Sequence, residues 1–379
     1  MDLTFYCPSN ICFGAGTLNK LTEVASLYGA TKILFITDPG IVKAGLAERA
    51  LKLLDDAGIP YFLADNVESD PSDDLCQGIF DRAKGENCNV MVAMGGGSTI
   101  DAAKAVNILY ANPGPISLYE GSNKVTRHGI PLIAIPTTAG TGSEADSNAV
   151  ITNVQAKRKM ILVGINNGPD YALCDPELTL TLPPRITAGP GMDALTHAME
   201  AYLSKLATPL SDSFALMGMA LIYNALPECV NNGSNLKARS DQMLGSMYGA
   251  IAMSNALQGI CHATTAPLGA YFHIPHGDAN AMCLPQAMKF NAVAVPERMV
   301  EMGVAMGMGK PGELTADDVV ENIFKLSKAC NMPGLASYGV SIDKIDEQFI
   351  TEVVTEYTAA FNPREIRRED VIPFIEACL

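Results

Sequence analysis

The sequence lacks tryptophan, has only five histidines and is poor in aromatic residues, which make up 6% of its 379 residues. It also lacks any run of about 18 uninterrupted apolar residues, the length that a membrane-spanning helix needs. Its first residues, Met-Asp-Leu-Thr-Phe, contain neither a basic stretch nor an apolar one, so they do not resemble a secretory signal. We therefore expect a cytoplasmic protein with no membrane partner.

Basic residues are scarce as well: 26 Lys and Arg stand against 41 Asp and Glu, giving a net charge of -15. A surface of this sign repels phosphate backbones, so no nucleic-acid partner is expected. Hydrophobic residues make up 48% of the chain and charged residues 18%, which excludes a disordered chain and a coiled coil. The length predicts roughly two to three domains.

The ten cysteines are scattered and include no Cys-x-x-Cys pair. Most lie in apolar surroundings, such as Cys283 between Met282 and Leu284, so we predict free, reduced thiols in the core; a metal or redox role is the alternative. Four of the five histidines fall within 80 residues of one another, which indicates a functional site.

The first half of the chain alternates short apolar runs with longer amphipathic ones. Runs at 32–37, 60–64, 89–94 and 132–135 predict strands, and the segments at 41–57, 72–85 and 98–110 have helical spacing. Strands separated by helices of this length predict a Rossmann-like parallel sheet with helices on its faces, in an α/β domain over residues 1–180.

No strand signal continues beyond about residue 180. The turn-rich segment 166–185, with four prolines, marks the boundary to an all-helical domain over residues 181–379. Its predicted helices are rich in Ala, Leu and Met and lie at 186–205, 209–226, 238–258, 293–307, 315–330 and 345–360.

A glycine loop, Gly95–Ser98, joins the strand at 89–94 to the next helix. Glycines let the backbone approach a ligand closely, and a helix N-terminus offers free N–H groups, so the loop predicts a pyrophosphate site; a plain turn is the alternative. A second segment of small and hydroxyl residues, 136–143, follows the strand at 132–135. Open α/β sheets bind ligands at such strand ends, which favours the ligand site.

Asp38 follows the first strand of this sheet. A carboxylate there can accept hydrogen bonds from a ribose 2′-OH and would repel a 2′-phosphate, which would give a preference for NAD(H) over NADP(H). On the sequence alone, a turn-forming role before Pro39 is the favoured interpretation.

A metal site is predicted in the helical half. Asp193 and His197 lie at i and i+4, on one face of a helix, although such a pair is often only hydrogen-bonded. His262 and His276 lie 14 residues apart, and prolines and a glycine over residues 267–275 predict a turn between two helical segments. One Asp and three His can surround a divalent cation, and this donor set suits Fe²⁺, Zn²⁺, Mn²⁺ or Ni²⁺ without selecting among them.

Several longer motifs carry a family resemblance. They are residues 11–16 (ICFGAG), 95–104 (GGGSTIDAAK), 136–144 (PTTAGTGSE), 191–200 (GMDALTHAME), 259–263 (GICHA), 275–277 (PHG) and 362–364 (NPR). With these motifs in this order, the chain resembles the iron-containing (group III) alcohol dehydrogenases, a family that includes lactaldehyde reductase and 1,3-propanediol dehydrogenase.

The resemblance implies a dinucleotide-binding N-terminal domain, a helical C-terminal domain, and a cleft between them for metal and nicotinamide. Composition alone would place Lys159 in a solvated basic patch, and only the resemblance gives it a role. The implied metal ligands are Asp193, His197, His262 and His276. The implied contacts to NAD(H) are Asp38, Gly95, Gly96, Gly97, Ser98, Thr137, Thr138, Thr141, Asn148, Lys159 and Leu178.

Two departures from the family pattern stand out. Asp70-Pro71 replaces a frequent Asn-Pro, so Asp70 adds a negative charge to the implied cofactor site. The family's H-A-x-x-H stretch ends here in Ala266, which removes a histidine proposed as a proton relay. The catalytic candidates close to this change are Thr264, Thr265 and His273, the last of which is otherwise a surface or packing histidine.

The function implied is a metal-dependent transfer of hydride between NAD(H) and a small alcohol or aldehyde, polar and anionic ones included. Fe²⁺ is the expected metal, Zn²⁺ a substitute for it, and a homodimer or larger homo-oligomer the expected assembly. Two alternatives are a metal- and NAD-dependent lyase of the dehydroquinate-synthase type and a catalytically idle binding protein, which the missing relay histidine suggests.

Overall fold

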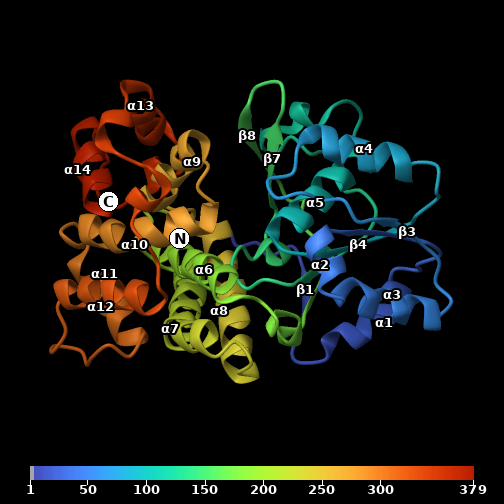
Figure 1. The fold of residues 1–379 in the computed structure, drawn as a ribbon, viewed down its shortest axis with the longest axis horizontal. Coiled ribbons are helices and arrows are strands. Elements are labelled where there is room, and N and C mark those ends of the chain that lie inside the picture. Colours follow the sequence, from blue (N-terminus) through green and yellow to red (C-terminus); the bar gives the residue numbers. More distant parts are fainter. Residues whose placement is uncertain (1–3) are drawn as a thin grey trace. The chain divides into compact units, whose positions relative to one another are not determined.

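The computed structural model describes residues 4–379 and divides into two compact units (Figure 1). The α/β unit comprises Cys7–Thr138 and Gly142–Thr179. The helical unit comprises Leu180–Leu379, Ala139–Thr141 and the described residues before Cys7. An α/β region is thus followed by a mostly helical one, which confirms the predicted fold class.

A six-stranded parallel sheet forms the centre of the α/β unit, in the order β1-β9-β6-β4-β2-β3. Side chains of one strand alternate between two apolar clusters: Leu34 and Ile36 belong to one, and Ile33 and Phe35 to the other. Both faces of the sheet are therefore covered, as parallel sheets require. The strands are β1 (Asn10–Phe13), β2 (Ile33–Thr37), β3 (Tyr61–Ala64), β4 (Val90–Gly95), β6 (Leu132–Pro136) and β9 (Tyr171–Cys174).

The four strands predicted in this unit are all present, but β1 and β9 were not predicted. The helix predicted over 41–57 is interrupted, because Gly45 adopts a left-handed conformation with φ of 73°. A smaller sheet contains β5 (Gly121–Ser122), β7 (Asn148–Asn153) and β8 (Arg158–Val163). The helices are α1 (Leu21–Leu27), α2 (Pro39–Lys43), α3 (Leu46–Asp56), α4 (Asp73–Ala83) and α5 (Gly97–Ala111).

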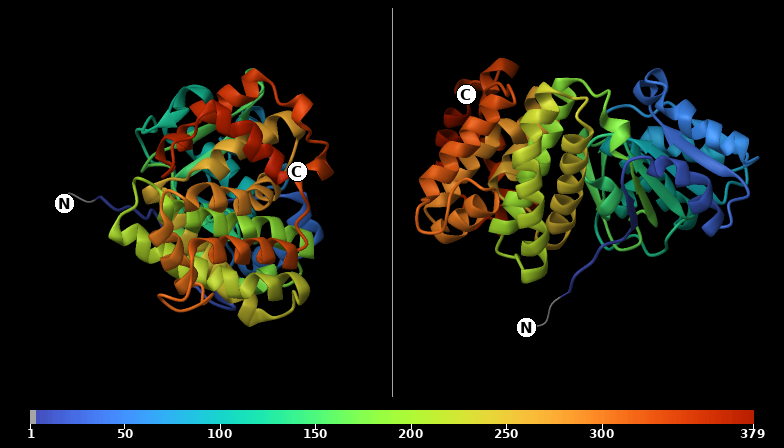
Figure 2. Two further views of the ribbon diagram at one scale, coloured as in Figure 1. Left: turned by 90° about the vertical axis from the view of Figure 1, so that its left-hand side faces the viewer. Right: turned by 90° about the horizontal axis from the view of Figure 1, so that it is seen from below.

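The helical unit packs around α6, which is buried along most of its length by α7, α8 and α10 (Figures 1 and 2). Gly140 belongs to this unit because it lies against α6, where an added Cβ would come 2.4 Å from the Cβ of Pro190. The helices are α6 (Pro184–Leu203), α7 (Pro209–Asn231), α8 (Leu236–Ala256), α9 (Ile260–Phe272), α10 (His276–Ala292), α11 (Pro296–Ala305), α12 (Ala316–Ala329), α13 (Glu347–Thr355) and α14 (Arg368–Cys378).

The turn predicted over residues 267–275 is shorter than expected. Pro267 and Gly269 lie inside α9, which continues to Phe272. The helix ends where His273 adopts a left-handed conformation, with φ of 55°. An interior proline removes one helix hydrogen bond and crowds the carbonyl one turn earlier. The helix nevertheless continues past Pro267, where Leu268 packs in the apolar core.

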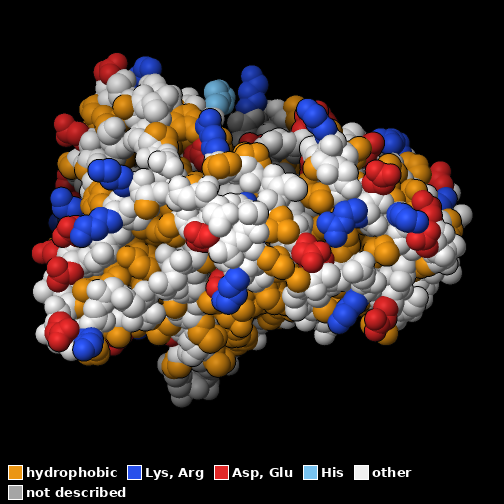
Figure 3. All heavy atoms as spheres, turned by 60° about the horizontal axis from the view of Figure 1, so that its bottom comes forward, with side chains coloured by type: hydrophobic (Ala, Val, Ile, Leu, Met, Phe, Trp, Pro, Cys, Tyr) orange, Lys and Arg blue, Asp and Glu red, His pale blue; other side chains and the backbone are white. Residues whose placement is uncertain are grey.

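One helix in the described part of the chain, α7, is long and apolar enough to cross a membrane by length and composition. It packs against α6 and α8, and its Met219 and Ile222 belong to the apolar core, so helix packing accounts for its composition. On the face drawn in Figure 3, acidic and basic side chains are interspersed among apolar and neutral ones. All ten cysteines are free and eight of them are buried, as their spacing predicted.

Candidate active site

The glycine loop lies at the carboxyl ends of three neighbouring strands of the large sheet. Strands β4 and β6 are neighbours with Gly95 paired to Pro136, and β2 pairs Thr37 with Met94. From β2 the chain continues to β3 on one side of it and then to β4 on the other, so the strand order reverses here. Such a switch point, at the carboxyl ends of the strands, is where open α/β sheets bind ligands.

The loop itself is shaped for close backbone approach. An added Cβ at Gly95 would lie 2.3 Å from Thr99 Oγ1, so no larger residue fits. Gly96 precedes α5, and no side chain among the described residues caps this helix. The first N–H groups of this 15-residue helix therefore have no side-chain acceptor. Free N–H groups at a helix N-terminus are the hydrogen-bond donors that bind a pyrophosphate.

Both carboxylate oxygens of Asp38 accept hydrogen bonds. Its Oδ1 accepts a hydrogen bond from the N–H of Ile41 at 3.0 Å, which caps α2. Its Oδ2 accepts one from Thr99 Oγ1 at 3.0 Å, in the first turn of α5. The carboxylate thus forms the turn before Pro39 and lies beside the glycine loop.

Asp70 and Lys159 form an ion pair next to this loop. Lys159 Nζ lies 2.5 Å from Asp70 Oδ1, and the N–H of Asp70 faces Ser98 Oγ at 3.4 Å. The negative charge that distinguishes this chain from the family pattern therefore lies against the lysine implied to contact the cofactor.

The other implied cofactor residues differ in placement. Thr138 borders Gly96, with its side chain 3.4 Å from an added Cβ there, whereas Thr137 is fully buried. Asn148 begins β7, and its carbonyl accepts a hydrogen bond from Lys104 at 2.6 Å. The Leu178 side chain is buried in the apolar core, so only its backbone remains for a ligand. Thr141 lies in the segment that groups with the helical unit.

The predicted metal ligands come from three helices and lie together. Helix α6 carries Asp193 and His197, α9 carries His262, and His276 begins α10. Ligand atoms of Asp193, His262 and His276 all lie within 4.8 Å of one another. The ring of His197 stacks on that of His262, with centroids 4.9 Å apart, and its Nε2 lies 3.5 Å from Asp193 Oδ1.

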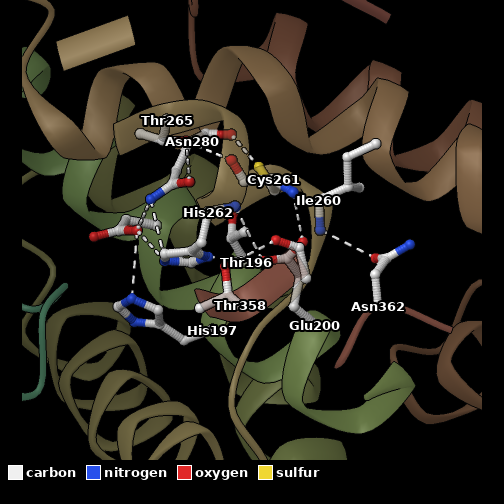
Figure 4. Close-up of polar contacts among 12 residues, drawn as sticks. Thr196, His197, Glu200, Ile260, Cys261, His262, Thr265, Asn280, Thr358 and Asn362 are labelled. Carbon is white, nitrogen blue, oxygen red and sulfur yellow. Dashed lines mark hydrogen bonds and ion pairs between the residues drawn. The ribbon is translucent and has the colours of Figure 1, made fainter. Parts of the chain in front are cut away.

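The chemistry of this cluster fits a cation. Asn280 Nδ2 lies 2.7 Å from Asp193 Oδ1, 3.2 Å from His262 Nε2 and 3.1 Å from His276 Nε2. Figure 4 shows Asn280 beside the ring of His262. Three atoms that can ligate a metal thus surround the Asn280 amide. Burial raises the pKa of Asp193, but the neighbouring histidines and Asn280 outweigh it and hold that pKa below its usual value. Burial lowers the pKa of His197, which favours the neutral imidazole that ligates metals.

Sequence reasoning missed two buried residues of this cluster, Asn280 and Glu200. Asn280 lies four residues after His276 on α10, and Glu200 lies three after His197 on α6. Glu200 accepts a hydrogen bond from His262 Nδ1 at 2.7 Å. The i+3 and i+4 spacing to proposed ligands is the signal that could have identified both.

The catalytic candidates near Ala266 are placed differently from one another. Thr265 is buried, and its hydroxyl donates to the Cys261 carbonyl and lies 2.6 Å from Asn280 Oδ1. Thr264 is fully buried, and its hydroxyl has no hydrogen-bond partner within residues 4–379. His273 and Ala266 are both exposed. Of the pair of threonines, Thr265 thus contacts the ligand cluster, through Asn280.

Known proteins match over the whole chain. The sequence profile of iron-containing alcohol dehydrogenases matches residues 8–176, and the C-terminal profile of the Fe-containing alcohol dehydrogenase family matches residues 187–379. The NAD-dependent methanol dehydrogenase of Bacillus methanolicus is 34% identical over 379 residues, which cover 99% of both chains.

Two solved structures share the fold. A crystal structure of 1,3-propanediol oxidoreductase superposes with a TM-score of 0.96 at 32% identity, over 100% of both chains. A second structure is the sulfoacetaldehyde reductase of Bifidobacterium kashiwanohense in complex with NAD⁺. It superposes with a TM-score of 0.92 at 28% identity, over 100% of this chain and 99% of its own. These matches confirm the family resemblance and favour an oxidoreductase over a lyase or an idle binding protein. The chain belongs to the iron-containing alcohol dehydrogenase family and is an enzyme of the oxidoreductase class.

Proposed function

We propose that the protein transfers hydride reversibly between NAD(H) and a small alcohol or aldehyde, at a divalent metal held by Asp193, His197, His262 and His276. The convergence of ligand atoms of Asp193, His262 and His276 within 4.8 Å of one another carries this proposal. The family and the NAD-dependent relative support the same chemistry.

Residues at the strand ends of the α/β unit bind the cofactor in this proposal. The N–H groups of α5 hold the pyrophosphate, and Lys159 adds a positive charge that Asp70 partly neutralises. Asp38 accepts hydrogen bonds from the adenosine ribose and disfavours a 2′-phosphate.

Residues of the helical unit hold the metal and the substrate. When bound, iron supplies a Lewis acid for the substrate oxygen, and NAD(H) supplies or accepts the hydride. Asp193 contributes the negative charge, and the neutral imidazoles complete the donor set. Zn²⁺ replaces Fe²⁺ at such a site, because both accept nitrogen and oxygen ligands.

The substrate class follows from relatives and from Ala266. Proteins of this fold are named for methanol, 1,3-propanediol and sulfoacetaldehyde, which are small and include an anion. Ala266 is exposed one helical turn after His262, so it leaves room where the family carries an imidazole. We therefore include polar and anionic aldehydes, and propose a cytoplasmic homodimer or larger homo-oligomer.

The test combines metal analysis with catalysis. Anaerobic protein loaded with Fe²⁺ is mixed with NADH and a panel of short aldehydes, and NADH oxidation is followed by absorbance. Metal content is compared between wild type, His262→Ala and a control, His128→Ala, in the α/β unit. We expect metal and activity to be lost only in His262→Ala; unchanged metal content in that variant would overturn the ligand assignment.

A further inference from the structure

Glu200 accepts three hydrogen bonds from the first turn of α9. It lies on α6 with 2% of its surface exposed. One carboxylate oxygen accepts from the N–H of Cys261 at 2.7 Å. The other accepts from the N–H of His262 at 3.3 Å and from the imidazole Nδ1 of the same residue at 2.7 Å (Figure 4). One buried carboxylate thus binds both the backbone and the ring of a proposed ligand.

The spacing along α6 explains how Glu200 reaches this position. Asp193, His197 and Glu200 lie at i, i+4 and i+7, on one face of a helix. The same rigid element therefore carries two proposed ligands and the carboxylate that contacts a third. Packing of α6 aligns all three at once.

The start of α9 is held by side chains from outside the helix. The first N–H groups of a helix have no acceptor within it. Glu200 satisfies two of them, and Asn362 Oδ1 accepts from the N–H of Ile260 at 3.0 Å. Gly259 makes this approach possible, since an added Cβ would lie 2.4 Å from Asn362 Oδ1 and 3.2 Å from Glu200 Oε1.

The contact at Nδ1 decides which nitrogen of His262 is free. An ionised carboxylate only accepts hydrogen bonds, so Nδ1 carries the proton. Nε2 then keeps its lone pair, and this atom faces Asn280 and lies 3.7 Å from Asp193 Oδ1. A histidine that binds metal through one nitrogen commonly donates the other N–H to a carboxylate, which fixes the tautomer and the ring orientation.

We propose that Glu200 is a positioning residue for the metal: it holds His262 in the tautomer whose Nε2 is free to ligate, and thereby sets metal affinity. This inference rests on the proposed function. It also places a second buried carboxylate next to the site, so Asp193 and Glu200 together balance the charge of a divalent ion. Glu200 itself contacts neither substrate nor cofactor in this proposal.

The test replaces the carboxylate with an amide of the same shape. In Glu200→Gln, the side-chain oxygen can still accept from a backbone N–H, but the amide nitrogen donates toward His262 Nδ1 and favours the other tautomer. Competition of Co²⁺ with a chelator measures metal affinity, and we expect it to fall on the order of 10–100-fold. At a pH high enough for His262 to be neutral, nitrogen-15 chemical shifts of the metal-free protein should report transfer of the proton from Nδ1 to Nε2 of His262, whose signals are identified by their loss in His262→Ala.

Asn362→Ala is the matched control, because it removes the neighbouring cap of α9 without touching His262. It should lower the melting temperature and leave the tautomer and the Co²⁺ affinity close to those of wild type. If Glu200→Gln does not fold, Glu200→Asp replaces it; its shorter carboxylate should weaken Co²⁺ binding at least several-fold.

The outcomes separate the two proposals. If wild type binds Co²⁺ and Glu200→Gln binds it equally well with an unchanged tautomer, Glu200 is only a structural cap and the inference is overturned. If wild type and His262→Ala bind Co²⁺ alike, the metal site of the proposed function fails instead.

Discussion

At the scale of single residues, the same side chain often has a structural and a functional contact. Asp38 uses one oxygen to cap α2 and the other to bind Thr99 at the start of α5. Its carboxylate is held in place before any ligand arrives. A fixed negative charge beside a cofactor site discriminates more strongly than a mobile one, because it cannot turn away from a 2′-phosphate.

Asp38→Asn tests this discrimination while keeping an acceptor for the N–H of Ile41. We expect NADPH to gain on the order of tenfold in affinity relative to NADH, because like-charge repulsion is removed. Fluorescence titration with each dinucleotide measures the ratio. Asp38→Gly should shift it in the same direction. A wild-type protein that binds both dinucleotides equally well would show that Asp38 has no such role.

At the scale of elements, α9 brings together several features of the site. His262 lies in its first turn, and Ala266 follows at i+4, exposed on the same face. Thr265, at i+3 from His262, is buried and hydrogen-bonds with Asn280 of α10, which also contacts His262. The helix therefore presents one proposed ligand, one contact to the ligand cluster and one exposed position on neighbouring parts of its surface.

Ala266→His should place an imidazole one helical turn after the proposed ligand His262. If only a proton relay is missing, turnover of simple aldehydes should rise, within the roughly 10²–10⁴-fold that proton transfer contributes, or its pH profile should shift. If the natural substrate fills the space, the variant should bind that substrate more weakly and spare the smallest aldehydes. Steady-state kinetics over a range of pH distinguishes the two.

Ala270→His is the matched control, since Ala270 is exposed one turn further along α9. It should behave as wild type. An Ala266→His variant that changes neither turnover, pH profile nor binding would mean that position 266 does not line the active site.

At the scale of the whole molecule, this acidic protein also buries charge. In the α/β unit, Lys104 is fully buried and lies 2.5 Å from Asp146 Oδ1. Burial raises the pKa of Asp146 to about 6, although Lys104 opposes it. Burial also raises the pKa of Glu144 to about 7, and the charge of Asp146 adds to this. Ionising Glu144 in the folded protein is therefore unfavourable.

Glu144→Gln should make stability less dependent on pH. The pKa of Glu144 is raised in the folded state. Its contribution to the free energy of unfolding is therefore fully present below the unfolded pKa near 4.5 and is lost as pH rises through about 7. Because Gln cannot ionise, the difference in free energy of unfolding between the variant and wild type should be more favourable to the variant at pH 8 than at low pH, by on the order of 3 kcal/mol.

Chemical denaturation of both proteins at low and high pH measures this difference. Glu68→Gln is the control, because Glu68 is exposed in the same unit. Glu68→Gln should not change how the free energy of unfolding depends on pH. A constant difference between Glu144→Gln and wild type at all pH values would show that Glu144 has a normal pKa.

Local patterns in the sequence determined the fold class and the strands that carry the glycine loop. Branched apolar runs and 3.6-residue periodicity are properties of neighbouring residues, so they predicted β2, β3, β4 and β6 and most of the long helices. The i, i+4 spacing of Asp193 and His197 likewise put them on one face of α6. The break at Gly45 and the continuation of α9 through Pro267 depended on local backbone conformation and packing, which periodicity does not specify.

Only the tertiary structure decided which distant residues meet. Packing of α6, α9 and α10 places His262 and Asn280 against Asp193, although about 70 to 90 positions separate them from it in the chain. The pairing of Asp70 with Lys159 and the contact of Glu200 with His262 depend on the same long-range packing. Side-chain chemistry determines what each residue can bind, but its partners are set by how the helices and strands bury their apolar faces.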